Sequence, residues 1–390
     1  MRKIKTAAII TAALLALTGC EEMSAPSGVP TISVNPVKTG SSQSSSESSE
    51  SGSNSSSVES GENSAASENS EKEPVSSSAT SMNETSEPDV SSTGVKGELS
   101  GTIIVDATGR GMPIFGGGTG ETYAAAVNEV KDKVGDQVNV FSMIVPTQGS
   151  FYMPEGLSMA SEWDCIENVN SQLWGIIPVD AYTALSKHVD EEIYARTDHH
   201  WMQLGAYYAA EEFVKTAKIS EPFAPLSEYE KRDIGGYLGS LYGYSNENAT
   251  MAANPETFTY YIAPNDFATY YMNPEDYDFT RNTMFLDMPT SSSYSTFMGG
   301  DEKVVHIETD VKNARKLLVV KDSYPNALIP CLTGSFEEIW SVDMRYLEEM
   351  KNFPTSISQI VRDKGVTDVL FCMDTFSAVG ENANHLPGIV

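Results

Sequence analysis

Two histidines stand beside a carboxylate in the segment Thr197-Asp198-His199-His200-Trp201, and the whole chain has only five histidines. If this segment is extended, side-chain alternation puts Asp198 and His200 on one side and His199 on the other. A carboxylate at that spacing can accept a hydrogen bond from one imidazole nitrogen and leave the second nitrogen free as a base. The segment therefore predicts an Asp–His pair for general base catalysis.

Two other interpretations of this segment remain open. A helical pattern follows it directly, so Thr197 or Asp198 could simply be the N-cap of that helix. The carboxylate and the two imidazoles could also bind a metal ion. Two adjacent histidines on a strand diverge, however, and no further His or Cys cluster completes a site, so we expect neither a metal nor a cofactor.

A serine occupies a second place where chemistry is expected, in the turn Lys321–Asn326 between an apolar strand and an apolar helical stretch. Such a turn lies at the carboxyl end of a parallel strand, where open α/β sheets bind ligands, and at a helix N-terminus, which stabilises negative charge. Asp322 or Ser323 could instead cap the helix. Together with Asp198 and His200, Ser323 forms a candidate Ser-His-Asp set.

The elements that must position these residues alternate between strand and helix. Short apolar runs, typical of strands buried on both faces, occupy residues 102–105, 138–145, 317–320, 339–342 and 369–372. Helical patterns cover residues 121–134, 201–217, 327–332 and 356–364. The alternation predicts an α/β fold with a parallel sheet flanked by helices. Residues from about 219 to 300 break the pattern and predict an irregular, partly β insertion over one end of the sheet.

The first 98 residues do not fit a globular domain. Residues 1–20 carry a basic start and an apolar run too short to span a bilayer, which predicts a secretory signal peptide. Residues 21–98 contain 26 Ser among 78 residues, with 13 acidic and 3 basic side chains and no aromatic residue. This composition predicts a disordered, acidic spacer. The globular domain is expected over residues 99–390.

Charge and cysteine content exclude some classes of function. The net charge of the chain is -29, and most of it falls in the globular part, which should repel nucleic acid and anionic lipid headgroups. We therefore expect no nucleic-acid partner. Cys165, Cys331 and Cys372 include no CxxC pair, so the sequence gives no support to a redox motif or a metal cluster.

Two groups of residues resemble a known family. Thr197–Trp201 with Gly205-Ala206-Tyr207, and Val320–Tyr324 with Asn326 and Val342–Tyr346, resemble the DHHW protein family over roughly residues 102–373. That family is similar to the alginate O-acetyltransferase-like branch of the SGNH hydrolases, which implies an SGNH-like fold. The resemblance also implies that Asp198 orients His200, that His200 is the base, and that Ser323 is the nucleophile. Lys321 stands where the superfamily usually has a Gly before Asp-Ser.

The chemistry implied by the resemblance is acyl transfer through an acyl-enzyme. The Ser323 amide would stabilise the oxyanion, with Gly300 or Asn326 as a second donor. Arg345 follows an apolar strand and could anchor an anionic glycan, or it could form a salt bridge with a nearby carboxylate.

A further resemblance concerns the start of the chain. Leu17-Thr18-Gly19-Cys20 resembles the lipobox of bacterial lipoproteins, which implies cleavage before Cys20 and lipidation of its sulfur. The sequence thus predicts an extracytoplasmic, lipid-anchored acyltransferase or esterase. It would add or remove O-acetyl groups on a cell-envelope polysaccharide, with that glycan and an acyl donor as partners. The alternative is a catalytically silent surface lipoprotein that binds glycan or acts as a scaffold.

Overall fold

The computed structural model describes residues 86–88, 94–350, 353–354 and 356–390. The predicted signal peptide, Cys20 and most of the predicted spacer lie outside these residues. Within the described part, no helix has both the length and the apolar character needed to cross a membrane. Gly97–Ser100 form strand β1, which pairs antiparallel with β2 (Ile103–Asp106). Strand β1 therefore includes Gly97 and Glu98, two residues that lie before the predicted boundary at residue 99.

Eight strands form the central sheet, in the order β5-β4-β13-β11-β12-β10-β8-β9. Their bounds are β4 Asn139–Val145, β5 Ile177–Pro178, β8 Phe267–Met272, β9 Phe279–Asn282, β10 Val304–Thr309, β11 Lys316–Lys321, β12 Glu338–Asp343 and β13 Asp368–Asp374. The strands from β5 to β12 pair in parallel, whereas β10, β8 and β9 continue the sheet antiparallel. Strands β11 and β13 are buried along almost their whole length, as expected for apolar strands covered on both faces.

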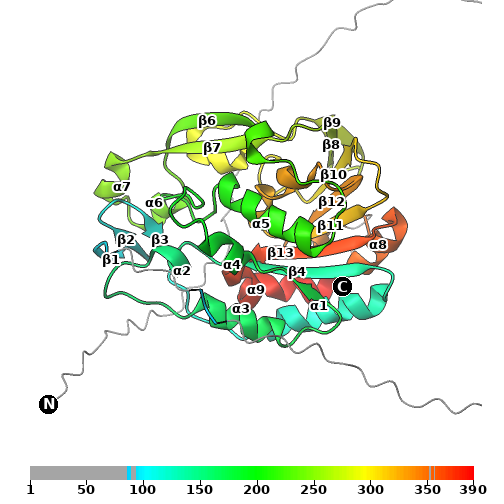
Figure 1. Cartoon of the computed structure of the whole chain (residues 1–390), viewed down its shortest axis with the longest axis horizontal. Coiled ribbons are helices and arrows are strands. Elements are labelled where there is room, and N and C mark those ends of the chain that lie inside the picture. The colour runs from blue at the N-terminus through cyan, green and yellow to red at the C-terminus, as the bar shows by residue number, and fades with distance from the viewer. Residues whose placement is uncertain (1–85, 89–93, 351–352, 355) are drawn as a thin grey trace, which may run out of the picture. The chain divides into compact units, whose positions relative to one another are not determined.

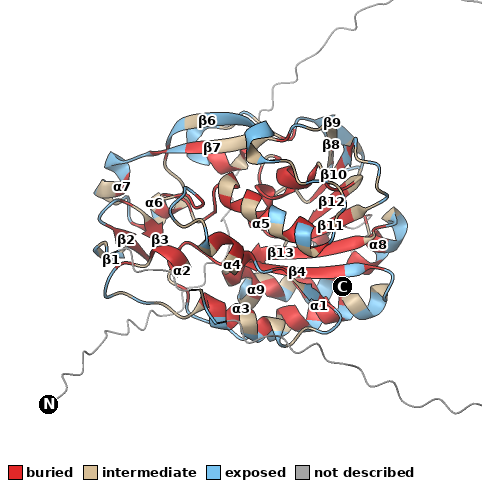
Figure 2. Ribbon diagram, in the orientation of Figure 1, coloured by how far each residue is buried: buried red, intermediate tan, exposed pale blue. Residues whose placement is uncertain are grey.

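Helices cover both faces of this sheet (Figure 1). One layer contains α1 Glu121–Val134, α3 Glu162–Asn170, α8 Ile357–Lys364, α9 Thr375–Val379 and α10 Leu386–Ile389, and the other contains α4 Ala181–Ser186 and α5 Gln203–Thr216. Figure 2 shows that the strands of the sheet are mostly buried and that the covering helices contain both buried and exposed residues. The shorter helices are α2 Gly149–Tyr152, α6 Ser240–Tyr244, α7 Ala249–Ala253, η1 Leu226–Glu228, η2 Thr290–Thr296, η3 Tyr324–Asn326, η4 Ile329–Leu332, η5 Leu347–Glu349 and η6 Glu381–His385.

Two predicted elements differ in the structure. Residues 102–105 were expected in the parallel sheet, but β2 belongs to a separate antiparallel sheet with β1 and β3 (Gly111–Met112). A tight turn at Gly101, whose φ is 61°, folds β1 back onto β2. Residues 327–332 were expected to form an α-helix, but only the short 3-10 helix η4 forms there. Pro330 lacks the N–H that a longer helix would use.

The predicted insertion is only partly separate from the main sheet. Strands β6 (Glu230–Tyr237) and β7 (Glu256–Ile262) form a two-stranded sheet of their own. Strands β8 and β9 instead extend the central sheet through β10, and do not lie over its end. Sequence patterns missed β10 because its apolar residues alternate with His306 and Glu308, which a strand near the edge of a sheet tolerates.

Candidate active site

Ser323 lies in the turn that follows β11, at the carboxyl edge of the parallel strands. Its backbone is helical (φ -77°, ψ -21°), and it directly precedes η3. The Asp322 carboxylate accepts hydrogen bonds from the Tyr324 N–H (2.8 Å) and from the Asp374 N–H at the end of β13 (3.0 Å). Asp322 therefore caps the turn and ties it to the neighbouring strand, while the Ser323 hydroxyl is left free of any capping role.

Asp198 and His200 lie in a tight loop and not in the extended segment that the sequence predicted. An antiparallel bridge between Tyr194 and Trp201 closes this loop, and α5 begins after it at Gln203. The N-cap of α5 is Met202, which makes no side-chain cap, so the N-cap interpretation of Asp198 is wrong.

Buried polar contacts fix the conformation of the loop. The Glu256 carboxylate accepts the N–H groups of Arg196 and Thr197, both at 2.7 Å, as well as the Thr197 hydroxyl. The Gln148 side chain donates to the Asp198 carbonyl at 2.8 Å. Because such groups are costly to bury without partners, this network favours one loop geometry.

Two hydrogen bonds that involve Tyr324 help to join the loop to the serine turn. The Trp201 indole N–H donates to the Tyr324 carbonyl at 2.8 Å, and the Tyr324 hydroxyl donates to the His199 carbonyl. Trp201 and Tyr324 are both almost completely buried. The last residue of the DHHW segment thus holds the two candidate segments together.

The structure brings Asp198, His200 and Ser323 together in one chain of hydrogen bonds. His200 Nδ1 lies 2.6 Å from Asp198 Oδ1, and His200 Nε2 lies 2.8 Å from Ser323 Oγ. The second Asp198 oxygen accepts the Ser240 N–H at 2.9 Å. Gly239 permits this approach, because a Cβ there would lie 2.3 Å from Asp198 Oδ2. This geometry is that of a nucleophile, a base and a group that orients the base.

The electrostatics of the site keep Asp198 ionised. Burial alone would raise the pKa of Asp198, but the neighbouring His200 and the Ser240 N–H hold that pKa well below its usual range. A buried carboxylate beside Nδ1 favours the tautomer in which Nδ1 carries the proton and Nε2 is free to accept one from Ser323.

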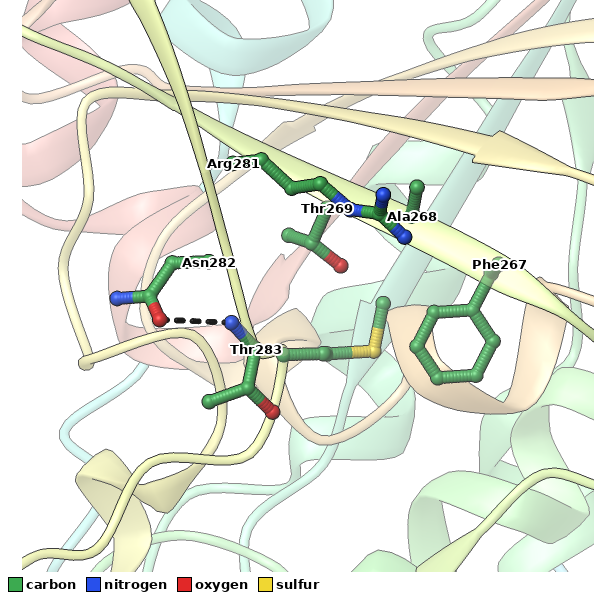
Figure 3. A pocket seen from close by; sticks show the side chains of 7 residues that line it. Phe267, Ala268, Thr269, Arg281, Asn282 and Thr283 are labelled. Carbon is green, nitrogen blue, oxygen red and sulfur yellow. Dashed lines mark hydrogen bonds between the residues drawn. The ribbon is translucent and has the colours of Figure 1, made fainter. Parts of the chain in front are cut away.

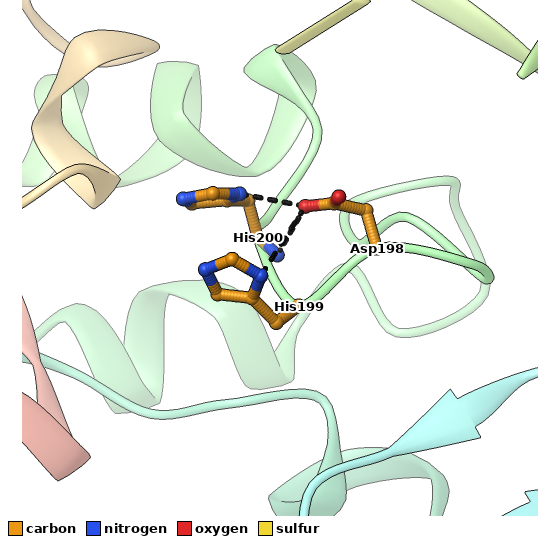
Figure 4. Close-up of side chains that lie close together, drawn as sticks. All are labelled: Asp198, His199 and His200. Carbon is orange, nitrogen blue, oxygen red and sulfur yellow. Dashed lines mark hydrogen bonds and ion pairs between the residues drawn. The ribbon is translucent and has the colours of Figure 1, made fainter. Parts of the chain in front are cut away.

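His199 does not point away from His200 as alternation predicted. Because the loop is tightly turned, the two imidazole rings lie side by side with centroids 3.8 Å apart, and both face Asp198 (Figure 4). His199 Nδ1 lies 2.6 Å from Ser240 Oγ and 3.7 Å from Asp198 Oδ1. Burial, together with the nearby His200, lowers the pKa of His199 to about 4.

This convergence bears on the metal interpretation, which was set aside because adjacent histidines should diverge. One ligand atom from each of Asp198, His199 and His200 lies within 4.8 Å of the others, so the three could reach one cation. In the structure these atoms are engaged in hydrogen bonds with one another and with Ser240.

The three predicted oxyanion donors, Ser323, Gly300 and Asn326, differ in whether they already donate a hydrogen bond within the protein. Among the described residues, the Ser323 N–H has no hydrogen-bond acceptor and remains available. The Gly300 N–H donates to the Phe297 carbonyl at 3.0 Å, so Gly300 is not a donor to substrate. Asn326 is fully buried, and its side-chain amide donates to the Gly300 carbonyl at 2.9 Å, so it braces the turn.

Arg345 forms the salt bridge that was the alternative to glycan binding. Its guanidinium contacts the Asp343 carboxylate through Nε (2.8 Å) and Nη2 (2.6 Å), and Nη2 also lies 2.9 Å from Asp301. Burial opposes its charge, but the Asp343 contacts raise the pKa of Arg345 above its usual value. Asp343 and Asp301 therefore pair with the positive charge of Arg345 that would be needed to bind an anionic glycan.

Sequence reasoning missed Tyr294, which lies directly against the candidate base. Its ring stacks on His200 with centroids 3.7 Å apart and an interplanar angle of 6°. Its hydroxyl donates to the carbonyls of Ser323 (3.0 Å) and Tyr324 (2.7 Å). Nothing in the sequence distinguishes Tyr294 from the other tyrosines of the insertion, so only tertiary contacts reveal this role.

A separate cavity of about 370 Å³ opens where β8 and β9 diverge (Figure 3). It is lined by Phe267, Ala268, Thr269, Arg281, Asn282, Thr283 and Met284. None of these residues belongs to the chain of hydrogen bonds around Ser323.

Comparisons with solved structures agree with this architecture. The chain is 44% identical to a DHHW family protein from Eubacterium siraeum, with a TM-score of 0.71, covering 76% of this chain and 98% of that one. Bacillus cereus PatB1, solved with a sulfonyl adduct, is 17% identical with a TM-score of 0.58, covering 72% of this chain and 96% of PatB1. The predicted fold class, an SGNH-hydrolase-like α/β fold, is confirmed. No curated protein matches the chain.

The match that supports the family assignment covers most of the chain. The profile of the DHHW protein family matches residues 58–342, which include both the DHHW segment and the serine turn. The E. siraeum protein carries the same family name and is covered almost completely. The chain belongs to the DHHW protein family.

Proposed function

We propose that this protein is a serine-dependent acyltransferase or esterase that adds or removes O-acetyl groups on a cell-envelope polysaccharide. The observation that carries the proposal is the 2.8 Å contact between His200 Nε2 and Ser323 Oγ, with Asp198 bound to the other imidazole nitrogen. The SGNH-like fold supports it, because that fold is compatible with acyl chemistry at the carboxyl edge of the sheet.

The proposed reaction has two steps. His200 Nε2 accepts the hydroxyl proton of Ser323 as Oγ bonds to the acetyl carbonyl carbon, and the Ser323 N–H stabilises the oxyanion. His200 then gives this proton to the leaving alcohol as its bond to the carbonyl carbon breaks, which leaves an acetyl-enzyme. Water or a sugar hydroxyl next attacks the acetyl carbon, and His200 accepts its proton. His200 then returns this proton to Ser323 Oγ as the bond between Oγ and the acetyl carbon breaks, which releases acetate or acetylated sugar. Asp198 stabilises the imidazolium in both steps.

Covalent labelling tests the nucleophile. Because PatB1 accommodates a sulfonyl adduct, phenylmethanesulfonyl fluoride is a suitable probe, and we expect one adduct per chain at Ser323. The variants Ser323→Ala and His200→Ala should not be labelled, whereas Ser220→Ala, in an exposed loop, should be labelled like the unmodified protein. If the unmodified protein neither reacts nor hydrolyses an aryl acetate, the alternative of a silent glycan-binding lipoprotein is favoured.

A second experiment separates transfer from hydrolysis. Acetyl release from an aryl acetate is measured with and without added envelope oligosaccharide, and the oligosaccharide is examined by mass spectrometry. A transferase gives acetylated sugar, whereas an esterase gives only acetate.

The proposed lipid anchor has a test of its own. Cells grown with an alkyne-tagged fatty acid should label the protein, and Cys20→Ser should abolish that label. Persistence of the label in Cys20→Ser would contradict lipidation at this residue.

A further inference from the structure

Lys321 is a buried lysine immediately before the Asp-Ser pair, where the SGNH pattern usually has a glycine. It is the last residue of β11, and only 1% of its surface is exposed. Its ammonium group donates to the Asp322 carbonyl at 3.2 Å and pairs with Asp343 Oδ2, also at 3.2 Å. A lysine is rarely buried to this degree unless it is paired, so this side chain has a specific structural task.

One of these contacts acts on the peptide that carries the candidate oxyanion donor. The Asp322 carbonyl and the Ser323 N–H belong to the same planar peptide unit, and the described peptides include no cis bond. In a trans peptide these two groups point in opposite directions. Because Lys321 holds the carbonyl on the interior side, the Ser323 N–H faces away from the core, and no described residue accepts it.

The ammonium group is itself held in place by charge. Asp343 is fully buried in the neighbouring strand β12, directly opposite Lys321 in the parallel register. Asp343 also binds Arg345 through two nitrogens, and Arg345 contacts Asp301. The lysine is therefore anchored to a rigid strand and cannot easily swing away from the Asp322 carbonyl.

We infer that Lys321 is a positioning residue, which fixes the Asp322–Ser323 peptide so that the Ser323 N–H points at the oxyanion of the reacting ester. A glycine at this position has no side chain that could hold the Asp322–Ser323 peptide. Here the buried Lys321 side chain holds that peptide from the interior side. A charge-assisted bond to the carbonyl also polarises the peptide and makes its N–H a better donor. This inference rests on the proposed function, because it assigns a role within that reaction.

Kinetics of Lys321→Met test the inference against a matched substitution. Lys316→Met removes the other lysine of β11, whose side chain is partly exposed and pairs with Glu338 at 2.7 Å. We expect Lys321→Met to lower kcat for aryl acetate hydrolysis by about 10- to 100-fold with KM almost unchanged, because one oxyanion donor is misaligned. Lys316→Met should leave kcat unchanged. Equal kcat values in the two variants would overturn the positioning role.

The double variant Lys321→Met/Asp343→Asn covers the case in which the single variant does not fold. Removal of both partners avoids leaving a surplus buried carboxylate, so the double variant should fold. It should remain as slow as Lys321→Met, because the Asp322 carbonyl still lacks its donor. Recovery of the unmodified rate in the double variant would show that the lysine only balances charge.

Crystal structures of the unmodified protein and of the foldable variant provide a readout that does not depend on activity. We expect the Asp322–Ser323 peptide to rotate, or to adopt more than one orientation, once the lysine is removed. An unchanged peptide would overturn the inference even if the protein proved to have no acyl chemistry. Failure of the proposed function would instead appear as absence of labelling in the unmodified protein.

Discussion

Asp198→Asn is the substitution whose effect follows most directly from the geometry. The Asp198 carboxylate accepts the His200 ring N–H, the His200 backbone N–H and the Ser240 N–H, at 2.6, 3.0 and 2.9 Å. An asparagine amide has only one acceptor oxygen, so its NH2 group must face at least one of these donors. If it faces His200 Nδ1, the imidazole takes the tautomer that cannot accept the proton of Ser323.

The size of the effect can be worked from the contact distance. During the reaction His200 becomes a cation 2.6 Å from the Asp198 carboxylate. At an effective dielectric constant of about 20, a full charge pair at this distance is worth about 6 kcal/mol as an upper bound. A neutral amide retains part of this as a hydrogen bond, so we expect a loss of about 4 kcal/mol, or roughly 10³-fold in kcat.

The assay is steady-state hydrolysis of an aryl acetate near neutral pH, with urea unfolding measured on the same samples. Asp136→Asn is the matched control, because the Asp136 side chain is 99% exposed and lies outside the site. Asp198→Asn should be folded and slow, and the control should be indistinguishable from the unmodified protein. A folded Asp198→Asn that retains kcat within about threefold of the unmodified protein would refute the assigned role of this carboxylate.

Two further predictions concern stability. Trp201→Phe removes the indole N–H that joins the two segments, so the free energy of unfolding should fall by about 2 kcal/mol in urea melts. Trp174→Phe, at a residue 58% exposed, should change it by less than about 0.5 kcal/mol. The pKa of His199 is lowered from 6.5 to about 4 in the folded protein. Between these two pH values the unfolded chain binds a proton that the folded protein does not, so the free energy of unfolding should fall as the pH is lowered from 6.5 to 4. His199→Gln should flatten that slope, and an unchanged slope would contradict a neutral, partly buried His199.

Local sequence pattern was sufficient for the elements whose residues repeat regularly. The periodic apolar residues of Glu121–Val134 predicted α1 at its observed bounds, and the apolar runs at 317–320 and 369–372 predicted the centres of β11 and β13. A strand that is buried on both faces consists of a short run of apolar residues, which can be recognised from a few consecutive positions. Strand β10 carries a weaker signal, because the polar residues His306 and Glu308 interrupt its apolar residues.

The sequence by itself determined which residue types were available for chemistry: an Asp-x-His segment before a helix, and a serine after a buried strand. Only the tertiary structure decided that His200 and Ser323, 123 residues apart, lie within hydrogen-bond distance, and that Tyr294 packs on the base. It also decided that Lys321 turns inward to the serine peptide. The physical reason is that local conformation follows from neighbouring residues, whereas contacts between distant segments depend on how the whole core packs.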